Sequence, residues 1–187
     1  RDLPYVGRLG NLFETSTGTG RVRLLIWQGV GELMTTFPDI GVTDDRHRII
    51  APVLGYGPET MNIAFSRTYQ PELAQLEARR ASPDRSHNDL MDYLVGTGAA
   101  GLLSYLALFV TILSTARRSL RSPVLSENGP GMPQLPIKLL LAGLTAALVG
   151  HFVESQVGIV IVSTRALFWV YAAAIVALPF LVERLSP

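Results

Sequence analysis

The chain has 187 residues, a formal net charge of +1 at pH 7 and no cysteine. The nearly balanced charge excludes a nucleic-acid-binding polycation and a disordered acidic tail, and the lack of cysteine excludes disulfides, thiolate metal ligands and thiolate nucleophiles. The mean hydropathy of +0.31 is high for a soluble domain but low for a chain that lies wholly in a membrane. We therefore expect a polar part joined to a hydrophobic part, with the division near residue 89.

The polar part is expected to be a loop domain with short helices. Residues 1–20 are rich in glycine and threonine, which is typical of a loop, whereas residues 21–34 carry apolar side chains at helical spacing and predict one amphipathic helix. Glycine and proline recur through residues 35–58, which disfavours long regular elements and predicts a turn-rich loop. Short helices are expected at residues 59–69 and 71–81, the second with proline at its first position.

The hydrophobic part contains a first apolar run, Leu90–Ala116, that is long enough to cross a membrane. Its roughly 27 residues, at about 1.5 Å each, exceed a hydrocarbon core of about 30 Å. Asp92 is its one ionisable side chain. The small residues between Gly96 and Gly101 are typical of a surface that a neighbouring helix approaches closely.

A connector and two further apolar runs follow. Residues 117–136 are basic and then rich in proline and glycine, and apolar runs at 137–153 and 166–182 predict a transmembrane hairpin within residues 137–187. The predicted fold is therefore mainly α: a fragment of a polytopic membrane protein in which a large extracytoplasmic loop domain, residues 1–89, precedes three transmembrane helices.

The short loops predict the orientation of the chain in a cytoplasmic membrane. Arg117, Arg118, Arg121 and Lys138 cluster on one side of the spans, and the positive-inside rule makes that side cytoplasmic. Residues 1–89 would then face outward. The chain begins with Arg rather than Met and its start has no signal-peptide core, so we expect the natural polypeptide to continue upstream.

Three titratable groups are expected at the outward face of the cytoplasmic membrane. His87 precedes the first span, and His151 and Glu154, three residues apart on one helix face, end the second. Ionisable groups at membrane depth are functional candidates by default. There are structural alternatives: Ser86 to Asp89 matches a capping box, and His151 with Glu154 matches a hydrogen-bonded pair between helices. A zinc site is not expected, because no HExxH occurs.

Arginines in the first predicted helix are the candidate anion ligands. Arg21 and Arg23 lie close together, and Trp27 is one turn beyond Arg23 on the same face. Their guanidinium groups suit bidentate contact with a diphosphate, but the same pattern also fits a solvated helix end or contact with lipid headgroups. Spacing alone leaves these alternatives open.

Several motifs, taken in order, resemble the O-antigen ligase and polymerase family. They are RLLIWQG (Arg23–Gly29), LGYGPE (Leu54–Glu59) and SHNDLMDYLVGTGAAGLLSYL (Ser86–Leu106), followed by HFVESQVGI and ALFWVYAAAIVAL, which resemble that family's last membrane hairpin. The resemblance covers nearly the whole chain. It implies a metal-independent, cofactor-free glycosyltransferase of the GT-C type, which moves a glycan from an undecaprenyl diphosphate carrier to an acceptor hydroxyl of a glycan or lipid outside the cytoplasm.

The resemblance also implies roles for particular residues. Arg23, or its neighbour Arg21, would bind the diphosphate, and His87 of the His-Asn motif would sit at the catalytic centre. From the topology we expect Asn88 and the pair His151 and Glu154 to support it. A second diphosphate-binding arginine stays open among Arg67, Arg79, Arg80 and Arg85, of which Arg85 is nearest to His87 in the sequence.

The chain departs from the family in size, because the family has many spans and this chain offers three. The competing interpretation is a non-catalytic structural subunit of a larger membrane complex, docked through the glycine- and alanine-rich face of the first span.

Overall fold

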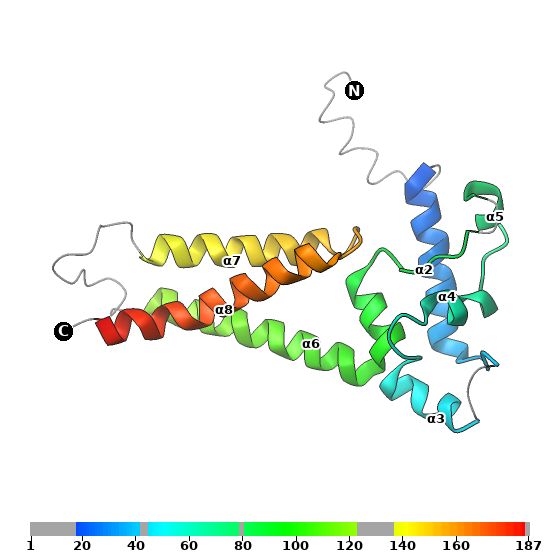
Figure 1. The fold of residues 1–187 in the computed structure, drawn as a ribbon, viewed down its shortest axis with the longest axis horizontal. Coiled ribbons are helices and arrows are strands. Elements are labelled where there is room, and N and C mark those ends of the chain that lie inside the picture. Colours follow the sequence, from blue (N-terminus) through cyan, green and yellow to red (C-terminus); the bar gives the residue numbers. More distant parts are fainter. Residues whose placement is uncertain (1–17, 42–44, 79–80, 123–136, 186–187) are drawn as a thin grey trace, which may run out of the picture. The chain divides into compact units, whose positions relative to one another are not determined.

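The computed structural model describes residues 18–41, 45–78, 81–122 and 137–185. Within these ranges the chain is helical and contains no strand, which confirms the mainly α prediction there. It divides into two compact units, Arg1–Leu102 and Leu103–Pro187. The elements, labelled in Figure 1, are α2 (Gly18–Thr36), α3 (Asp45–Leu54), α4 (Met61–Ala64), the 3-10 helix η1 (Phe65–Arg67), α5 (Leu73–Leu76), α6 (Asp89–Arg121), α7 (Ile137–Glu154) and α8 (Val162–Leu185).

The first unit is built around one face of α2. Leu25, Val30 and Leu33 of this face are buried, together with Phe65 of η1 and Leu73 of α5. Close packing needs glycine in α2 as well: a Cβ atom at Gly29 would lie 2.5 Å from the Phe65 ring and 2.7 Å from the Thr68 carbonyl oxygen. The short helices η1 and α5 therefore contact α2, and Met61 and Ala64 of α4 belong to the same buried cluster; the elements are labelled in Figure 1.

Helix α6 is broken at Gly98, where φ is +65° and ψ is −166°. This backbone conformation is essentially restricted to glycine. The carbonyls of Val95 and Gly96 would accept bonds from residues one turn further on in a regular helix. At the break they accept bonds from the main-chain N–H groups of Tyr56 (2.8 Å) and Gly57 (3.1 Å). The LGYG loop of the first unit is thus hydrogen-bonded to the backbone of α6 beside Gly98.

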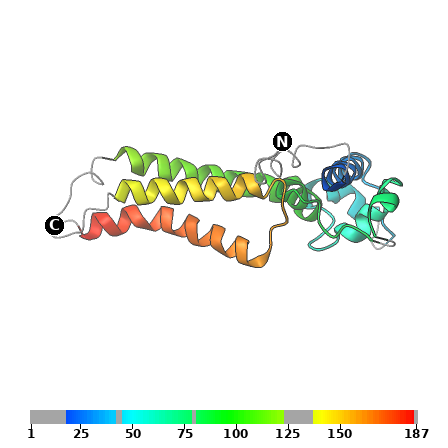
Figure 2. The ribbon, with the colours of Figure 1, turned by 90° about the horizontal axis from the view of Figure 1, so that it is seen from above.

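The second unit consists of the rest of α6 with α7 and α8, which run side by side in both Figure 1 and Figure 2. Aromatic rings hold it together. Phe109 of α6 stacks on Phe152 of α7 at 4.4 Å between ring centroids, and Tyr105 of α6 lies 6.1 Å from Phe168 of α8. Many other large apolar side chains on these helices are exposed, among them Leu139, Val153, Trp169 and Phe180.

Among the described residues, three helices are long and apolar enough to cross a membrane: Asp89–Arg121, Ile137–Glu154 and Val162–Val182. The predicted spans are therefore confirmed as apolar helices of the required length. No more than 22% of any span's most apolar window is buried within the chain. Because apolar helix surface of this extent is unfavourable in water, these helices require lipid or further helices around them.

Several predicted boundaries were wrong. Helix α3 runs through the stretch predicted as a loop and contains Pro52, although a proline at this position lacks the N–H that would bond to the carbonyl four residues earlier. Helix α6 continues past Ala116 to Arg121, and α8 begins at Val162 rather than Ala166. Thr164 explains the earlier start, because its hydroxyl accepts a bond from the Ile161 N–H (3.1 Å) and so caps the helix.

Other predictions were confirmed in part or lie outside the described residues. The predicted helix at 21–34 is present but begins earlier, at Gly18. The predicted helices at 59–69 and 71–81 are reduced to single turns within those ranges. Most of the loop predicted at 1–20, the connector after residue 122, and both Arg79 and Arg80 lie outside the described residues.

Candidate functional site

The His87 motif forms a tight turn that leads into α6. Helix α6 begins at Asp89, and the residue that caps it is Asn88, whose side-chain oxygen accepts a bond from the Met91 N–H at 3.0 Å. The predicted capping box, with Ser86 as the cap, was therefore wrong. The reason is the backbone at His87, whose φ of +59° lies in the left-handed region and turns the chain before the helix starts.

Ser86 anchors this turn from inside the unit. It is fully buried, and both its main-chain N–H and its hydroxyl lie 2.7 Å from Oδ1 of Asp92. The hydroxyl oxygen also accepts a bond from the Asn88 N–H at 3.1 Å. The first turn of α6 thus reaches back through Asp92 and holds the residue that precedes His87.

Helix α2 is tied to the same turn. The indole N–H of Trp27 donates to the Ser86 carbonyl at 2.9 Å, so the α2 face that carries Trp27, and Arg23 one turn earlier, lies against the His87 motif. The positive charge of Arg23 lowers the pKa of the His87 imidazole, although less than burial does. Two residues that are 64 positions apart in the sequence (87 minus 23) are thereby brought into one site.

His87 is held as a neutral imidazole. Burial is the main cause that lowers its pKa below the ordinary 6.5, and Arg23 lowers it further, against the opposing charges of Asp92, Asp84 and Glu77. Its ring has no hydrogen-bonding partner among the described residues. A non-glycine residue in the left-handed region is uncommon and is typical of functional sites. At pH 7 the ring can accept a proton from a bound hydroxyl group.

Arg21 and Arg23 differ in their environment. Arg21 makes a bidentate ion pair with Glu72 of the α5 turn, at 2.8 and 2.5 Å, and this pairing lowers the pKa of Glu72. Arg23 is half-buried and has no carboxylate partner among the described residues. Of the two candidate anion ligands, Arg23 is therefore the one whose guanidinium has hydrogen bonds to offer.

Arg85 lies beside the motif but is paired with Glu59, which also has a left-handed backbone, with φ at +58°. The pair borders a shallow pocket that encloses about 230 Å³, including space open to solvent. The pocket is lined by Gly57, Glu59, Thr60, Met61, Asp84, Arg85, Asp92, Val95 and Gly96. Arg85 would have to leave Glu59 before it could bind a second anion.

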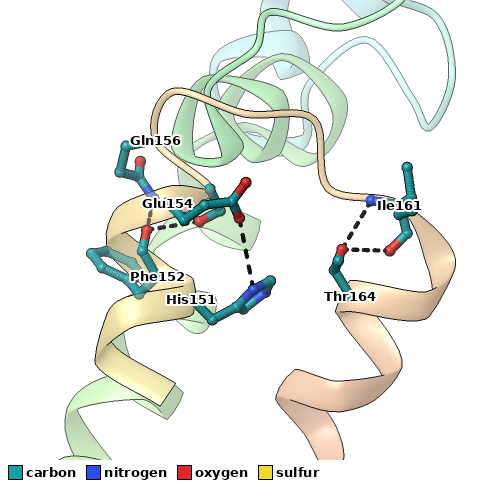
Figure 3. A network of polar contacts seen from close by, with 7 residues as sticks. His151, Phe152, Glu154, Gln156, Ile161 and Thr164 are labelled. Atoms are coloured by element: carbon teal, nitrogen blue, oxygen red, sulfur yellow. Dashed lines mark hydrogen bonds and ion pairs between the residues drawn. The ribbon is translucent and has the colours of Figure 1, made fainter. Parts of the chain in front are cut away.

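His151 and Glu154 belong to the second unit. Figure 3 shows them at the end of α7, where His151 Nδ1 lies 4.0 Å from a Glu154 carboxylate oxygen. The His151 ring is mostly buried, 5.9 Å from the Phe168 ring of α8, and its Nε2 has no partner among the described residues. The two residues are neighbours as their spacing predicts. Their convergence with His87 stays a prediction, since the two units are described separately.

Sequence reasoning missed two residues of the site. Asp92 stood out as the one ionisable group in the first apolar run, but its spacing of six from Ser86 matches no helical pair because a turn lies between them. Glu59 gave no signal, since its partner Arg85 is distant in the sequence.

The fold and the site define the class of the protein: within the described residues it is mainly helical, with three apolar helices of membrane-spanning length and a site that contains His87 and Arg23 at the start of the first. Comparison of the chain with protein-family models, with curated proteins and with solved structures finds no match.

Proposed function

We propose that the chain forms the outward-facing part of a glycosyltransferase, which moves a glycan from an undecaprenyl diphosphate carrier to an acceptor hydroxyl at the outer face of the cytoplasmic membrane. The observation that carries the proposal is the approach of Arg23 to a neutral, left-handed His87 beside a helix of membrane-spanning length. The ordered motifs that resemble the O-antigen ligase and polymerase family support it from the sequence.

The chemistry divides between the two residues. When a glycan leaves its carrier, negative charge grows on the departing diphosphate, and a guanidinium that is already in place stabilises this charge without reorganising. Arg23 would supply that cation. The acceptor hydroxyl must lose its proton as it attacks, and a neutral imidazole is suited to accept it. A lowered pKa, to which burial and then the nearby Arg23 cation contribute, keeps His87 in that form.

The location suits a substrate that hangs from a lipid. The diphosphate of such a carrier lies at the membrane surface while its chain stays among the acyl tails. The His87 turn directly precedes α6, and most of α6 is apolar and little buried within the chain. A carrier could therefore place its lipid along the helix and its charged group beside Arg23.

The proposal is tested with single substitutions in the complete natural polypeptide, assayed for transfer from a lipid-linked glycan in proteoliposomes. We expect His87→Ala to abolish transfer while membrane insertion is retained. We expect Arg23→Lys to reduce transfer by roughly 10²-fold although the charge remains, because bidentate contact is lost. Arg118→Lys, near the other end of α6, is the matched control and should leave transfer unchanged.

The structural-subunit alternative makes the opposite prediction. If His87→Ala and Arg23→Lys both transfer at the wild-type rate, the site has no catalytic role. The exposed apolar faces of α7 and α8 would then be explained by docking to partner helices in a larger complex.

A further inference from the structure

One carboxylate outside the proposed chemistry controls the shape of the site. Asp92 lies in the first turn of α6, and its Oδ1 accepts two bonds of 2.7 Å from Ser86, the residue immediately before His87. Both bonds cross the turn that contains His87. We propose that Asp92 is a positioning residue, which clamps Ser86 and so holds His87 in its left-handed conformation beside Arg23.

The hydrogen bonds from Ser86 to Asp92 help to explain why His87 stays in a left-handed backbone conformation. A histidine in the left-handed region is strained, and such strain persists only where surrounding contacts determine the conformation. The Asn88 cap fixes the residue after His87. The residue before it, Ser86, is fixed by its N–H bond to Asp92 and by the bond that its carbonyl accepts from the Trp27 indole. His87 itself contributes no hydrogen bond from its ring among the described residues. Its geometry therefore depends on the anchors at both sides.

Among these contacts, the one from Asp92 is expected to contribute most to holding the turn. Its carboxylate accepts the Ser86 main-chain N–H, and the same oxygen lies 2.7 Å from the Ser86 hydroxyl, whose single proton is shared between Asp92 and the Asn88 carbonyl at 2.8 Å. Bonds to an ionised acceptor are shorter and stronger than neutral ones. Ser86 is fully buried, so loss of Asp92 would leave a buried N–H group without its acceptor. The turn would then have to open to solvent.

The test distinguishes two effects of Asp92 on His87: its hydrogen bonds to Ser86 and its negative charge. The measured quantity is the His87 pKa, obtained by NMR of histidine-labelled protein in lipid nanodiscs. The chain has three histidines, and a His87→Gln sample assigns the signal. The charges of Asp92, Asp84 and Glu77 raise this pKa, whereas burial and Arg23 lower it, with burial as the largest cause. Loss of charge and loss of the clamp therefore move the pKa in opposite directions.

Three variants exploit this opposition. Asp92→Asn keeps an acceptor oxygen but loses the charge, so the His87 pKa should fall. Asp92→Ala also loses the clamp, and His87 should become exposed and move away from Arg23, so its pKa should rise toward 6.5. Ser86→Ala keeps the charge and the main-chain bond to Asp92 but removes the hydroxyl, which contacts both Asp92 and Asn88, so any rise in the His87 pKa reports loosening of the turn. It also decides the question if Asp92→Ala does not fold.

The exposed Asp84 provides the matched control, because it acts on His87 by charge but makes no hydrogen bond to Ser86. Asp84→Ala should lower the His87 pKa slightly, as a pure charge effect. If Asp92→Ala also lowers it, or if Ser86→Ala leaves it unchanged where Asp92→Ala does not fold, the clamp is refuted.

The role in catalysis rests on the proposed function and is measured separately. We expect Asp92→Ala to reduce kcat about 10²-fold with KM little changed, since misplacement of a catalytic group by about 1 Å has effects of that order, and Asp92→Asn to restore most of the rate. If the NMR result holds but no variant or wild-type sample transfers glycan, the clamp stands and the proposed function fails.

Discussion

Gly98→Ala tests the contact between the LGYG loop and the break in α6. A Cβ atom at Gly98 would lie 2.4 Å from the carbonyl carbon and oxygen of Val53, and 2.5 Å from the Gly55 nitrogen. These are main-chain atoms, so no side-chain rotation relieves the overlap. Alanine also disfavours the φ of +65° that the break requires.

The free-energy cost of Gly98→Ala can be worked out for two routes. An alanine held in this conformation costs about 1–3 kcal/mol. If the loop instead moves away, the bonds from Tyr56 and Gly57 to the helix carbonyls are lost, at about 1 kcal/mol each, together with burial of the Tyr56 side chain. By either route we expect the docked arrangement to lose about 3 kcal/mol, a large part of the stability of an ordinary domain.

The assay is hydrogen–deuterium exchange at the amides of Tyr56 and Gly57, measured by mass spectrometry in nanodiscs. A loss of about 3 kcal/mol corresponds to roughly 10²-fold faster exchange, since 1.4 kcal/mol is tenfold. Gly143→Ala in α7 is the control, because its Cβ would meet nothing within 4 Å and should leave this exchange unchanged. Wild-type protection in Gly98→Ala would refute the steric argument.

Three further outcomes are expected. Trp27→Phe removes the indole bond to Ser86 and should lower the free energy of unfolding by about 1 kcal/mol in denaturant titrations in detergent; no change would mean that the bond is not formed. Glu72→Gln should cause a small loss of thermal stability that disappears in high salt, because the Arg21 pair is partly exposed; a loss that persists in salt would contradict this. Glycan transfer should be lost on acidification with a midpoint below pH 6.5, because the folded protein keeps His87 neutral down to its lowered pKa; an acid midpoint above 6.5 would contradict the assignment. The free energy of unfolding should behave in the same way: the part that comes from burying His87 as a neutral group is complete above pH 6.5 and falls as the pH drops toward the lowered pKa.

The sequence predicted the three membrane-length helices because hydropathy depends on residues that are adjacent in the chain. Boundaries were harder, since they depend on single side chains such as Thr164, which caps α8. The small residues of α6 were expected to face another helix. At Gly98 they face the main chain at the end of α3 and the start of the loop that follows it, and composition cannot identify such a partner.

The candidate site was predictable in some of its residues but not in its arrangement. The motifs pointed to Arg23 and His87 as candidates and left the choice between Arg21 and Arg23 open, whereas the roles of Asp92 and Glu59 were missed. The choice depends on Glu72, which occupies Arg21 from a distant turn. In the same way, the left-handed backbone at His87 moves the helix cap from Ser86 to Asn88, and no sequence pattern reports a backbone angle.

The break in α6 also has a consequence for the order in which the chain assembles. Glycine permits the break at Gly98 but does not compel it, because a glycine can also adopt ordinary helical angles. Before the loop arrives, the carbonyls of Val95 and Gly96 can bond only within their own helix, and in a hydrocarbon environment they must do so. We therefore expect the segment to form a continuous helix until the loop docks, which would make its interruption a late step of folding.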